Sequence, residues 1–335
     1  TGGGLKGFVW EGRSNSDWAT GYNWNWDAGV AGDAVPKSWN NVTIPDVTND
    51  PVISTTTQAE CVDLIVASGA SLTINSDASS TGSLIVHGSA SGTVNAERYM
   101  TGNTWHIISG ATHGTDVSAF LNANSNIATG SGKRGMADYN TSGNAWNPYF
   151  TTGSGIVDIG KGYEMRITAN GTVTFSGVLA TGDQSVPVSD EGEGWNCIGN
   201  PYTSAIGVKS TATSATNFLT ENNSTNLDLS YQCAYLWDPA SSTYKIIGNL
   251  PTGVAGDRDL TQDYIQSGQG FFVKVKSGVS TVQFKSSMQA HQPTTELKSA
   301  DASWTYFTLN AAAGETNAST IVAFNKNMTK GLDPS

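Results

Sequence analysis

Acidic side chains near the end of this chain are one group whose type and spacing could hold an ion. Asp257, Asp259 and Asp263 fall within one short polar segment. Calcium prefers several oxygen ligands and is common outside cells, so these aspartates predict a calcium site, although their spacing does not match a twelve-residue calcium loop. We expect no cofactor otherwise, and the alternative for these carboxylates is a set of solvated turns.

Tryptophans are the second group with the chemistry of a binding surface. Residues 1–60 contain five of the ten tryptophans, and Trp24, Trp26 and Trp39 are the candidates for an aromatic platform. Trp24 and Trp26 would share one face of an extended segment, because side chains alternate along a strand. Exposed beside Asn and Asp, such rings would stack on sugar rings. The alternative is that they close the end of an apolar core.

Catalytic patterns are missing from the sequence. The glycine pairs that begin at Gly160 and Gly268 precede no helix, so they predict turns with positive φ rather than phosphate loops. Glu191 and Glu193 lie in polar, loop-like surroundings and are expected to be solvated. The four histidines have no metal-ligand spacing, and no Ser/His/Asp pattern is present. The sequence therefore predicts a protein that is not an enzyme.

The composition limits the partners. Only 13% of the 335 residues are charged, and the formal net charge is −11. Phosphate backbones and anionic membrane surfaces attract basic faces, so we expect neither nucleic acid nor membrane insertion. Abundant aromatic and small polar residues are typical of extracellular β-proteins. The three cysteines leave two alternatives open: Cys197 and Cys233 pair across neighbouring strands, or all three thiols are free and buried.

The organisation of the chain is dominated by an internal duplication. Trp105-His-Ile-Ile-Ser is answered by Trp195-Asn-Cys-Ile-Gly, and Gly160-Lys-Gly-Tyr by Gly268-Gln-Gly-Phe. A repeat implies that each copy is a structural unit. Short runs rich in Val, Ile and aromatics alternate with turn residues, which indicates an all-β class. We expect two β-sandwich, jelly-roll-like modules over residues 97–190 and 191–298, with Trp105 equivalent to Trp195 and Gly162 to Gly270.

The first module, residues 1–96, has a different pattern. Its short runs begin at Leu64, Leu72, Leu84 and Thr93, about ten residues apart and separated by small-residue turns. This spacing predicts a short β-solenoid or a tight meander, with the three leucines stacked rung on rung in one interior. A tryptophan-rich cap would close it. Residues 299–335 predict the start of a further β module, or strands added to the preceding sheets.

A family resemblance covers nearly the whole chain. It rests on Trp18…Asn23-Trp24…Asn41-Val-Thr-Ile-Pro45, Ser68-Gly-Ala-Ser-Leu-Thr-Ile74, Ile198-Gly-Asn-Pro-Tyr202 and Ser267-Gly-Gln-Gly-Phe-Phe-Val273. These segments resemble the opening modules of large secreted surface proteins of Bacteroidetes. The resemblance implies export by the type IX secretion route, an adhesin-like role and no defined active site. The chain opens without Met, so we expect a mature or excised piece of a longer protein.

Together these observations predict a non-catalytic, extracellular protein of the bacterial cell surface that acts in adhesion or assembly. As a structural subunit of a filament it would bind copies of itself, with Thr1–Gly4 and Asp333–Ser335 buried against another chain. The alternative is a carbohydrate-binding module of a larger secreted protein, whose partner is a surface glycan or protein.

Overall fold

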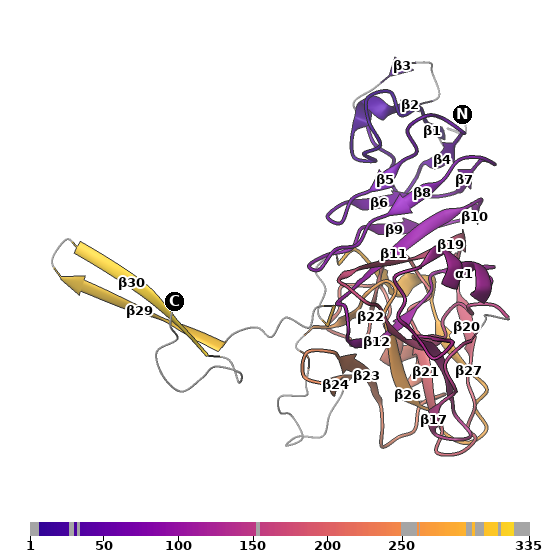
Figure 1. The fold of residues 1–335 in the computed structure, drawn as a ribbon. Helices are drawn as coiled ribbons and strands as arrows, with labels where there is room; N and C mark the ends of the chain where they lie inside the picture. The colour runs from indigo at the N-terminus through magenta and orange to yellow at the C-terminus, as the bar shows by residue number, and fades with distance from the viewer. Residues whose placement is uncertain are drawn as a thin grey trace.

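Strands dominate the computed structural model of this chain (Figure 1). The structure describes residues 7–26, 30–31, 34–151, 155–248, 260, 262–292, 297–298, 305–313 and 316–324. Among them are two short α-helices, neither of them long and apolar enough to cross a membrane. The prediction of an all-β class is confirmed.

The first hundred residues form a ladder of parallel strands that lies at the N-terminal end of the molecule (Figure 1). Three faces are built by strands that recur in order along the chain. They are β1 (Gly7–Trp10), β4 (Asn41–Ile44), β7 (Leu64–Val66) and β10 (Ala90–Ser91) on the first face, β5 (Val52–Ile53), β8 (Leu72–Ile74) and β11 (Val94–Met100) on the second, and β6 (Gln58–Cys61) and β9 (Ser83–Val86) on the third. The short strands β2 (Trp24–Trp26) and β3 (Val30–Ala31) extend the first face in antiparallel order.

The three leucines of this ladder do not stack on one another as the sequence predicts. Leu64, Leu72 and Leu84 are all buried and belong to one core, as expected. They lie on three different faces of a single coil, however, and are not stacked on one another. Leu64 instead pairs with Val42 on one neighbouring strand and with Ala90 on the other. The ten-residue spacing therefore separates successive strands within one coil. Strands that stack on each other in parallel are separated by a whole coil, because the chain must pass through the other faces before it returns to the same one.

Tryptophans close the outer end of the ladder. Trp10, Trp18 and Trp24 are buried to 1% exposure or less, and Trp24 makes edge-to-face contacts with the other two at 4.8 and 4.6 Å. The Trp24 indole N–H donates to the Trp18 carbonyl at 2.8 Å. Edge-to-face packing is favourable for aromatic rings, and the buried indole N–H is satisfied, so these residues form a stable cap.

The two repeats have sheets of matching strand order, which is what a duplication produces. The first contains β12 (Trp105–Ser109), β18 (Gly162–Arg166), β16 (Met136–Asn140) and β17 (Ala145–Trp146), adjacent in that order. The second contains β21 (Trp195–Gly199), β26 (Gly270–Lys274), β23 (Cys233–Asp238) and β24 (Thr243–Gly248), again in that order. Ser109 pairs with Gly162, and Gly199 with Gly270, so the registers also agree.

One buried asparagine in each repeat performs the same task. Asn124 follows α1 (Val117–Ala123), and Asn222 ends α2 (Phe218–Asn222). Each side-chain amide donates to a carbonyl four residues earlier and to a carbonyl of a later strand of the same repeat, β19 (Gly171–Leu179) or β27 (Thr281–Phe284). Each side-chain oxygen accepts from a backbone N–H of that same strand. These bonds fasten the helix to the strand in both copies.

The repeats approach most closely at glycines. A Cβ on Gly162 would lie 2.8 Å from the Ile198 carbonyl, and a Cβ on Gly270 would lie 2.9 Å from the Ile108 carbonyl. No side chain fits at such distances, so these two positions require glycine. Gly160 and Gly268 have φ values of +72° and +70°, which confirms that the glycine pairs begin with a turn in the left-handed region.

Shared strands connect the modules. β11 pairs in parallel with β8 and in antiparallel with β19, so the predicted boundary between residues 96 and 97 falls inside one strand. The module limits at 190/191 and 298/299, and a sandwich within each repeat, stay predictions. The remaining elements are β13 (Thr112–His113), β14 (Thr129–Gly130), β15 (Lys133–Arg134), β20 (Gln184–Pro187), β22 (Ala205–Gly207), β25 (Tyr264–Ile265), β28 (Gln289–Ala290), β29 (Thr305–Ala313), β30 (Thr316–Phe324) and the 3-10 turns Gly21–Asn23 and Ser286–Met288.

Two further features complete the fold. Cys61, Cys197 and Cys233 are buried and none of them forms a disulfide, so the alternative of a Cys197–Cys233 bridge is wrong. β29 and β30 pair with each other in antiparallel order over their full length, and with no other described strand. This hairpin falls in the region where the sequence predicts a further module or added strands.

Candidate functional site

The three tryptophans predicted to form a binding platform have different environments. Trp24 is fully buried in the cap, so it offers no face to a ligand, and its place in the platform was wrong. The side chain of Trp26 lies outside the described residues. Trp39 is 64% exposed and lines a hollow of about 270 Å³. Only Trp39 of the three is therefore seen in a position to contact a ligand.

The predicted calcium ligands are not brought together by the part of the chain that the structure describes. Asp257 and Asp259 lie outside that part. Asp263 forms an ion pair with Lys209 at 3.0 Å. Among the described residues, no group of three or more His, Cys, Asp or Glu side chains is arranged to hold a metal ion. The calcium site stays a prediction.

The hollow beside Trp39 is part of a longer groove where the ladder meets the second repeat. It adjoins a second hollow of about 650 Å³, and Glu60 and His291 line both. We call the two together the junction groove. Its wall on the ladder side is formed by Pro36, Lys37, Ser38, Trp39, Gln58, Glu60, Ile85, Val86 and His87. Its wall on the repeat side is formed by Thr213, Ser214, Ala215, Ser286, Ser287, Gln289, Ala290 and His291.

Hydrogen bonds across the junction fix this groove. The Thr203 hydroxyl donates to the Leu84 carbonyl at 2.9 Å, and the Leu84 amide donates to the Thr203 carbonyl at 3.1 Å. The ring of His291 lies 2.8 Å from the Ser83 hydroxyl through Nδ1. Strand β9 thereby bonds to the second repeat at Leu84 and Ser83, so the two walls are held at a fixed separation.

Glu60 lies in the middle of the groove between two histidines. Its carboxylate oxygens are 3.1 Å from Nε2 of His87 and 3.1 Å from Nε2 of His291. Partial burial alone would raise the pKa of Glu60, but the hydrogen bonds from both histidines outweigh burial and lower that pKa. Burial lowers the pKa of His291, against the opposing effect of Glu60. The groove therefore presents a carboxylate with a histidine ring on each side.

Two arrangements that hydrolases use are incomplete among the described residues of the groove. Ser83, His291 and Glu60 form a chain of hydrogen bonds like that of a serine hydrolase, but Ser83 is 3% exposed and lines neither hollow. A nucleophile must reach its substrate. Among the described lining residues Glu60 is the one carboxylate, whereas most glycosidases use a pair on either side of the bond.

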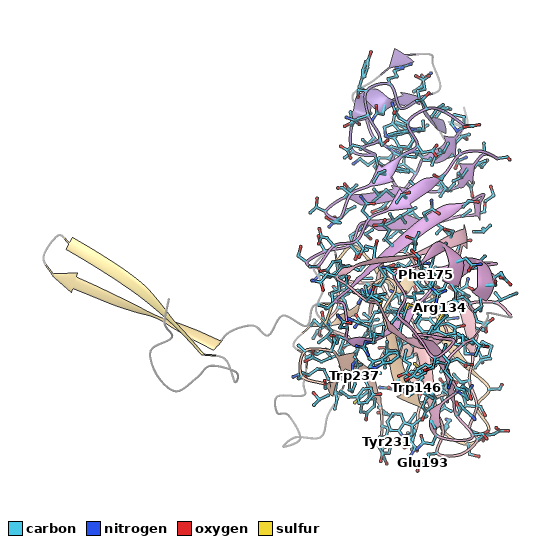
Figure 2. The ribbon with its side chains drawn as sticks, viewed as in Figure 1. Arg134, Trp146, Phe175, Glu193, Tyr231 and Trp237 are labelled. Atoms are coloured by element: carbon cyan, nitrogen blue, oxygen red, sulfur yellow. The ribbon has the colours of Figure 1, made fainter. Side chains whose placement is uncertain are left out.

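A hollow separate from the junction groove lies between the two repeats, and most of its lining residues are aromatic. Its volume is about 360 Å³. We call it the aromatic cleft, and its lining consists of Tyr139, Asn144, Trp146, Trp195, Tyr235, Tyr244, Ile246 and Phe272. Figure 2 shows Trp146 at the end of the molecule that is remote from the ladder. The cleft exists because two sheets that each carry aromatic residues face one another.

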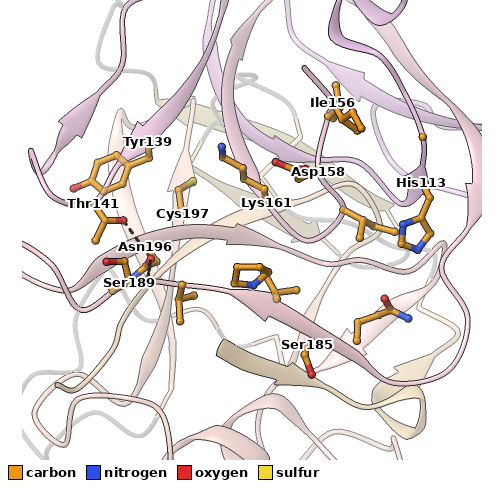
Figure 3. A pocket seen from close by; sticks show the side chains of 17 residues that line it. His113, Tyr139, Thr141, Ile156, Asp158, Lys161, Ser185, Ser189, Asn196 and Cys197 are labelled. Atoms are coloured by element: carbon orange, nitrogen blue, oxygen red, sulfur yellow. Dashed lines mark hydrogen bonds between the residues drawn. The ribbon is translucent and has the colours of Figure 1, made fainter. Parts of the chain in front are cut away.

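A third hollow, of about 760 Å³, adjoins the aromatic cleft at Tyr139 and runs along the segment that connects the repeats (Figure 3). Several of its polar groups already have partners. The Lys161 ammonium is 2.9 Å from the Asp138 carboxylate, and the Asn196 oxygen accepts from the Thr141 hydroxyl and from the Ser189 amide. These bonds hold the connecting segment in place.

The described part of this all-β chain thus has a polar groove at the junction and a separate aromatic cleft between the repeats. The chain is a member of the family described as a domain of unknown function, DUF8693, whose model matches residues 9–100 and 113–335. Comparison with curated proteins and with solved structures gave no match.

Sequence reasoning named Trp39 as a binding residue but none of the other residues of the junction groove, and it missed the aromatic cleft as a site. Glu60 and His291 are separated by 231 positions, so no local motif could connect them. The aromatic cleft did have a signal, since Tyr139 with Trp146 and Trp237 with Tyr244 form matching aromatic pairs in the two copies. That signal predicted hairpins with cross-strand partners. It did not show that the two hairpins face each other.

Proposed function

We propose that this protein is a non-catalytic adhesive module of a secreted bacterial surface protein, and that it adheres by binding a carbohydrate in the junction groove. The observation that supports this proposal is the exposed indole of Trp39 beside Glu60, His291 and Gln58 in one groove. Aromatic faces stack on the apolar faces of sugar rings, while carboxylates, amides and imidazoles bond to sugar hydroxyls.

The dimensions and the charge of the groove favour a neutral oligosaccharide over a single sugar or an acidic one. Its two hollows meet at Glu60, so a ligand that fills both must pass over that carboxylate. Hydroxyls and amides continue along the second hollow at Thr213, Ser286 and Gln289. The carboxylate and the net charge of −11 would repel an acidic sugar.

A filament contact was expected to bury the two ends of the sequence. These segments, Thr1–Gly4 and Asp333–Ser335, lie outside the described residues. Self-assembly therefore has no support from a described contact. An extracellular location at the surface of a Bacteroidetes cell, reached by type IX secretion, remains part of the proposal because the family resemblance implies it.

A glycan array followed by calorimetry with the best oligosaccharide tests the proposal. Trp39→Ala should weaken binding about tenfold or more, which corresponds to a loss of ~1.4 kcal/mol. Its unfolding free energy should change by less than about 0.5 kcal/mol, because the side chain is on the surface. Glu60→Gln should weaken binding as well, since the amide keeps the shape of the carboxylate but loses its charge.

Tyr22→Ala is the matched control. Tyr22 is also an exposed aromatic residue, at 54%, but it lines neither hollow of the junction groove. This variant should bind the oligosaccharide like the parent protein. An array without a neutral glycan among its hits would contradict the proposal, and so would equal losses in Trp39→Ala and Tyr22→Ala.

A further inference from the structure

The aromatic cleft is enclosed by rings from both repeats that meet edge to face. Phe272 lies at its centre, with ring centroids 4.8 Å from Tyr139, 5.8 Å from Trp146 and 5.7 Å from Tyr244. The planes of these rings are 76° to 87° from that of Phe272. Rings set nearly at right angles form the walls of a box. Each ring face carries the negative part of the aromatic quadrupole, which attracts cations.

A cation is already bound by rings at the rim of this cleft. The Lys274 ammonium lies 4.5 Å from the ring centroid of Tyr231 and 5.8 Å from that of Trp195. Lys274 is two residues beyond Phe272 on strand β26, so its side chain leaves the same face of the sheet. Trp195 lines the cleft itself. The aromatic surface of this cleft therefore binds an ammonium group within the protein.

A half-buried carboxylate, that of Glu164, belongs to the sheet of the first repeat. Glu164 is opposite Ile107 on one neighbouring strand and opposite Ala137 on the other. Ile107 packs in one cluster with Phe272, so the Glu164 side chain is on the face that looks toward the second repeat. One of its oxygens, Oε1, is buried and accepts no hydrogen bond. Among the described residues, no ion pair reaches this carboxylate.

The charge of Glu164 acts on the aromatic residues of the cleft. Burial raises the pKa of Glu164, although a hydrogen bond with Tyr149 opposes this effect. Burial raises the pKa of Tyr244 too, and the negative charge of Glu164 adds to the rise. The two groups therefore lie close enough to interact electrostatically. A cation in the cleft would offset the free-energy cost of partly removing this carboxylate from water.

We propose that the aromatic cleft binds a quaternary ammonium group of the kind that a choline headgroup carries. The rings of both repeats surround the cation, and Glu164 supplies the compensating charge. This site is independent of the junction groove and of the carbohydrate proposed to bind there. It gives the protein a second ligand of a different chemical class.

Choline and 3,3-dimethyl-1-butanol, its neutral isostere, separate attraction of a cation from simple apolar burial. The two probes have the same shape and differ in charge. Calorimetry should therefore show that the full chain binds choline at least tenfold more tightly than the neutral isostere. Trp146→Ala and Tyr244→Ala should each abolish choline binding. Tyr244→Phe, which keeps the ring, should retain it. Glu164→Gln should weaken it about three- to tenfold while leaving binding of the neutral isostere unchanged.

Trp39→Ala is the matched control for this site, because it removes an exposed indole from the junction groove instead. It should bind choline like the parent protein, and Trp146→Ala should still bind the oligosaccharide, which also shows that this variant is folded. Equal affinity for choline and the neutral isostere would overturn the proposal. So would the absence of choline binding to the parent protein. A Glu164→Gln variant with undiminished choline affinity would overturn the role of the carboxylate.

Discussion

Replacing Gly270 with alanine tests the close contact between the two repeats. A Cβ at this position would lie 2.6 Å from Cγ2 of Ile107 and 2.9 Å from the Ile108 carbonyl oxygen. The Ile107 side chain can shift, but the carbonyl belongs to strand β12 and is held by its ladder. Overpacking of this kind costs about 1–3 kcal/mol. Alanine also restricts the unfolded chain, which returns about 0.4–1 kcal/mol. We therefore expect a net loss of roughly 1–2 kcal/mol.

The measurement is urea unfolding at pH 7, followed by tryptophan fluorescence and by far-ultraviolet circular dichroism. Two probes are needed because the ladder and the repeats could unfold in separate steps. Gly130→Ala is the matched control, since a Cβ there meets nothing within 4 Å and Gly130 has no positive φ. That variant should be unchanged or slightly more stable. A Gly270→Ala protein as stable as Gly130→Ala would refute the packing described for the two repeats.

Two further predictions concern buried groups. Burial lowers the pKa of His106 to about 4, although a hydrogen bond to the Thr101 carbonyl opposes this shift. The unfolded chain has a pKa near 6.5 for this residue, so the neutral ring contributes stability above that pH, and the contribution is lost as the pH falls toward 4. Stability should fall by about 3 kcal/mol over this window, and His106→Gln should show a flatter profile in denaturant titrations at each pH. Burial raises the pKa of Cys61 to about 12 and that of Cys197 well above its usual range. A thiol reagent at pH 8 should therefore label neither residue in the native protein, whereas all three cysteines should react in denaturant. A denatured count below three would contradict the free thiols.

The duplication accounts for one of the two proposed sites. Each repeat presents an aromatic hairpin on the same face of its sheet, and the contact between the sheets brings the two hairpins together. The junction groove arises differently, because the second repeat bonds to strand β9 of the ladder through Thr203 and His291. One site thus follows from what the repeats share, and the other from where they differ.

Much of the fold was predictable from local patterns. Alternation of apolar and polar residues marks β4 and β11, in which every second side chain is buried. The repeated tryptophan and glycine positions predicted equivalent strands, because the same residues are needed where the same backbone contacts occur. The stacking of the ladder was not predictable in the same way. Leu64 and Leu72 are both buried, and the pairing of their strands shows that they lie on different faces.

By itself the sequence determined the strand content, the interior of the ladder, the equivalence of the two repeats and the turns at Gly160 and Gly268. These properties depend on residues close together in the chain or on direct repetition. The tertiary structure decided which aromatic residues are exposed, burying Trp24 and leaving Trp39 at the surface. It also decided that Glu60 meets His291, and that the rings of both repeats share one cleft. Such contacts join segments far apart in the chain, and their geometry depends on how whole sheets pack.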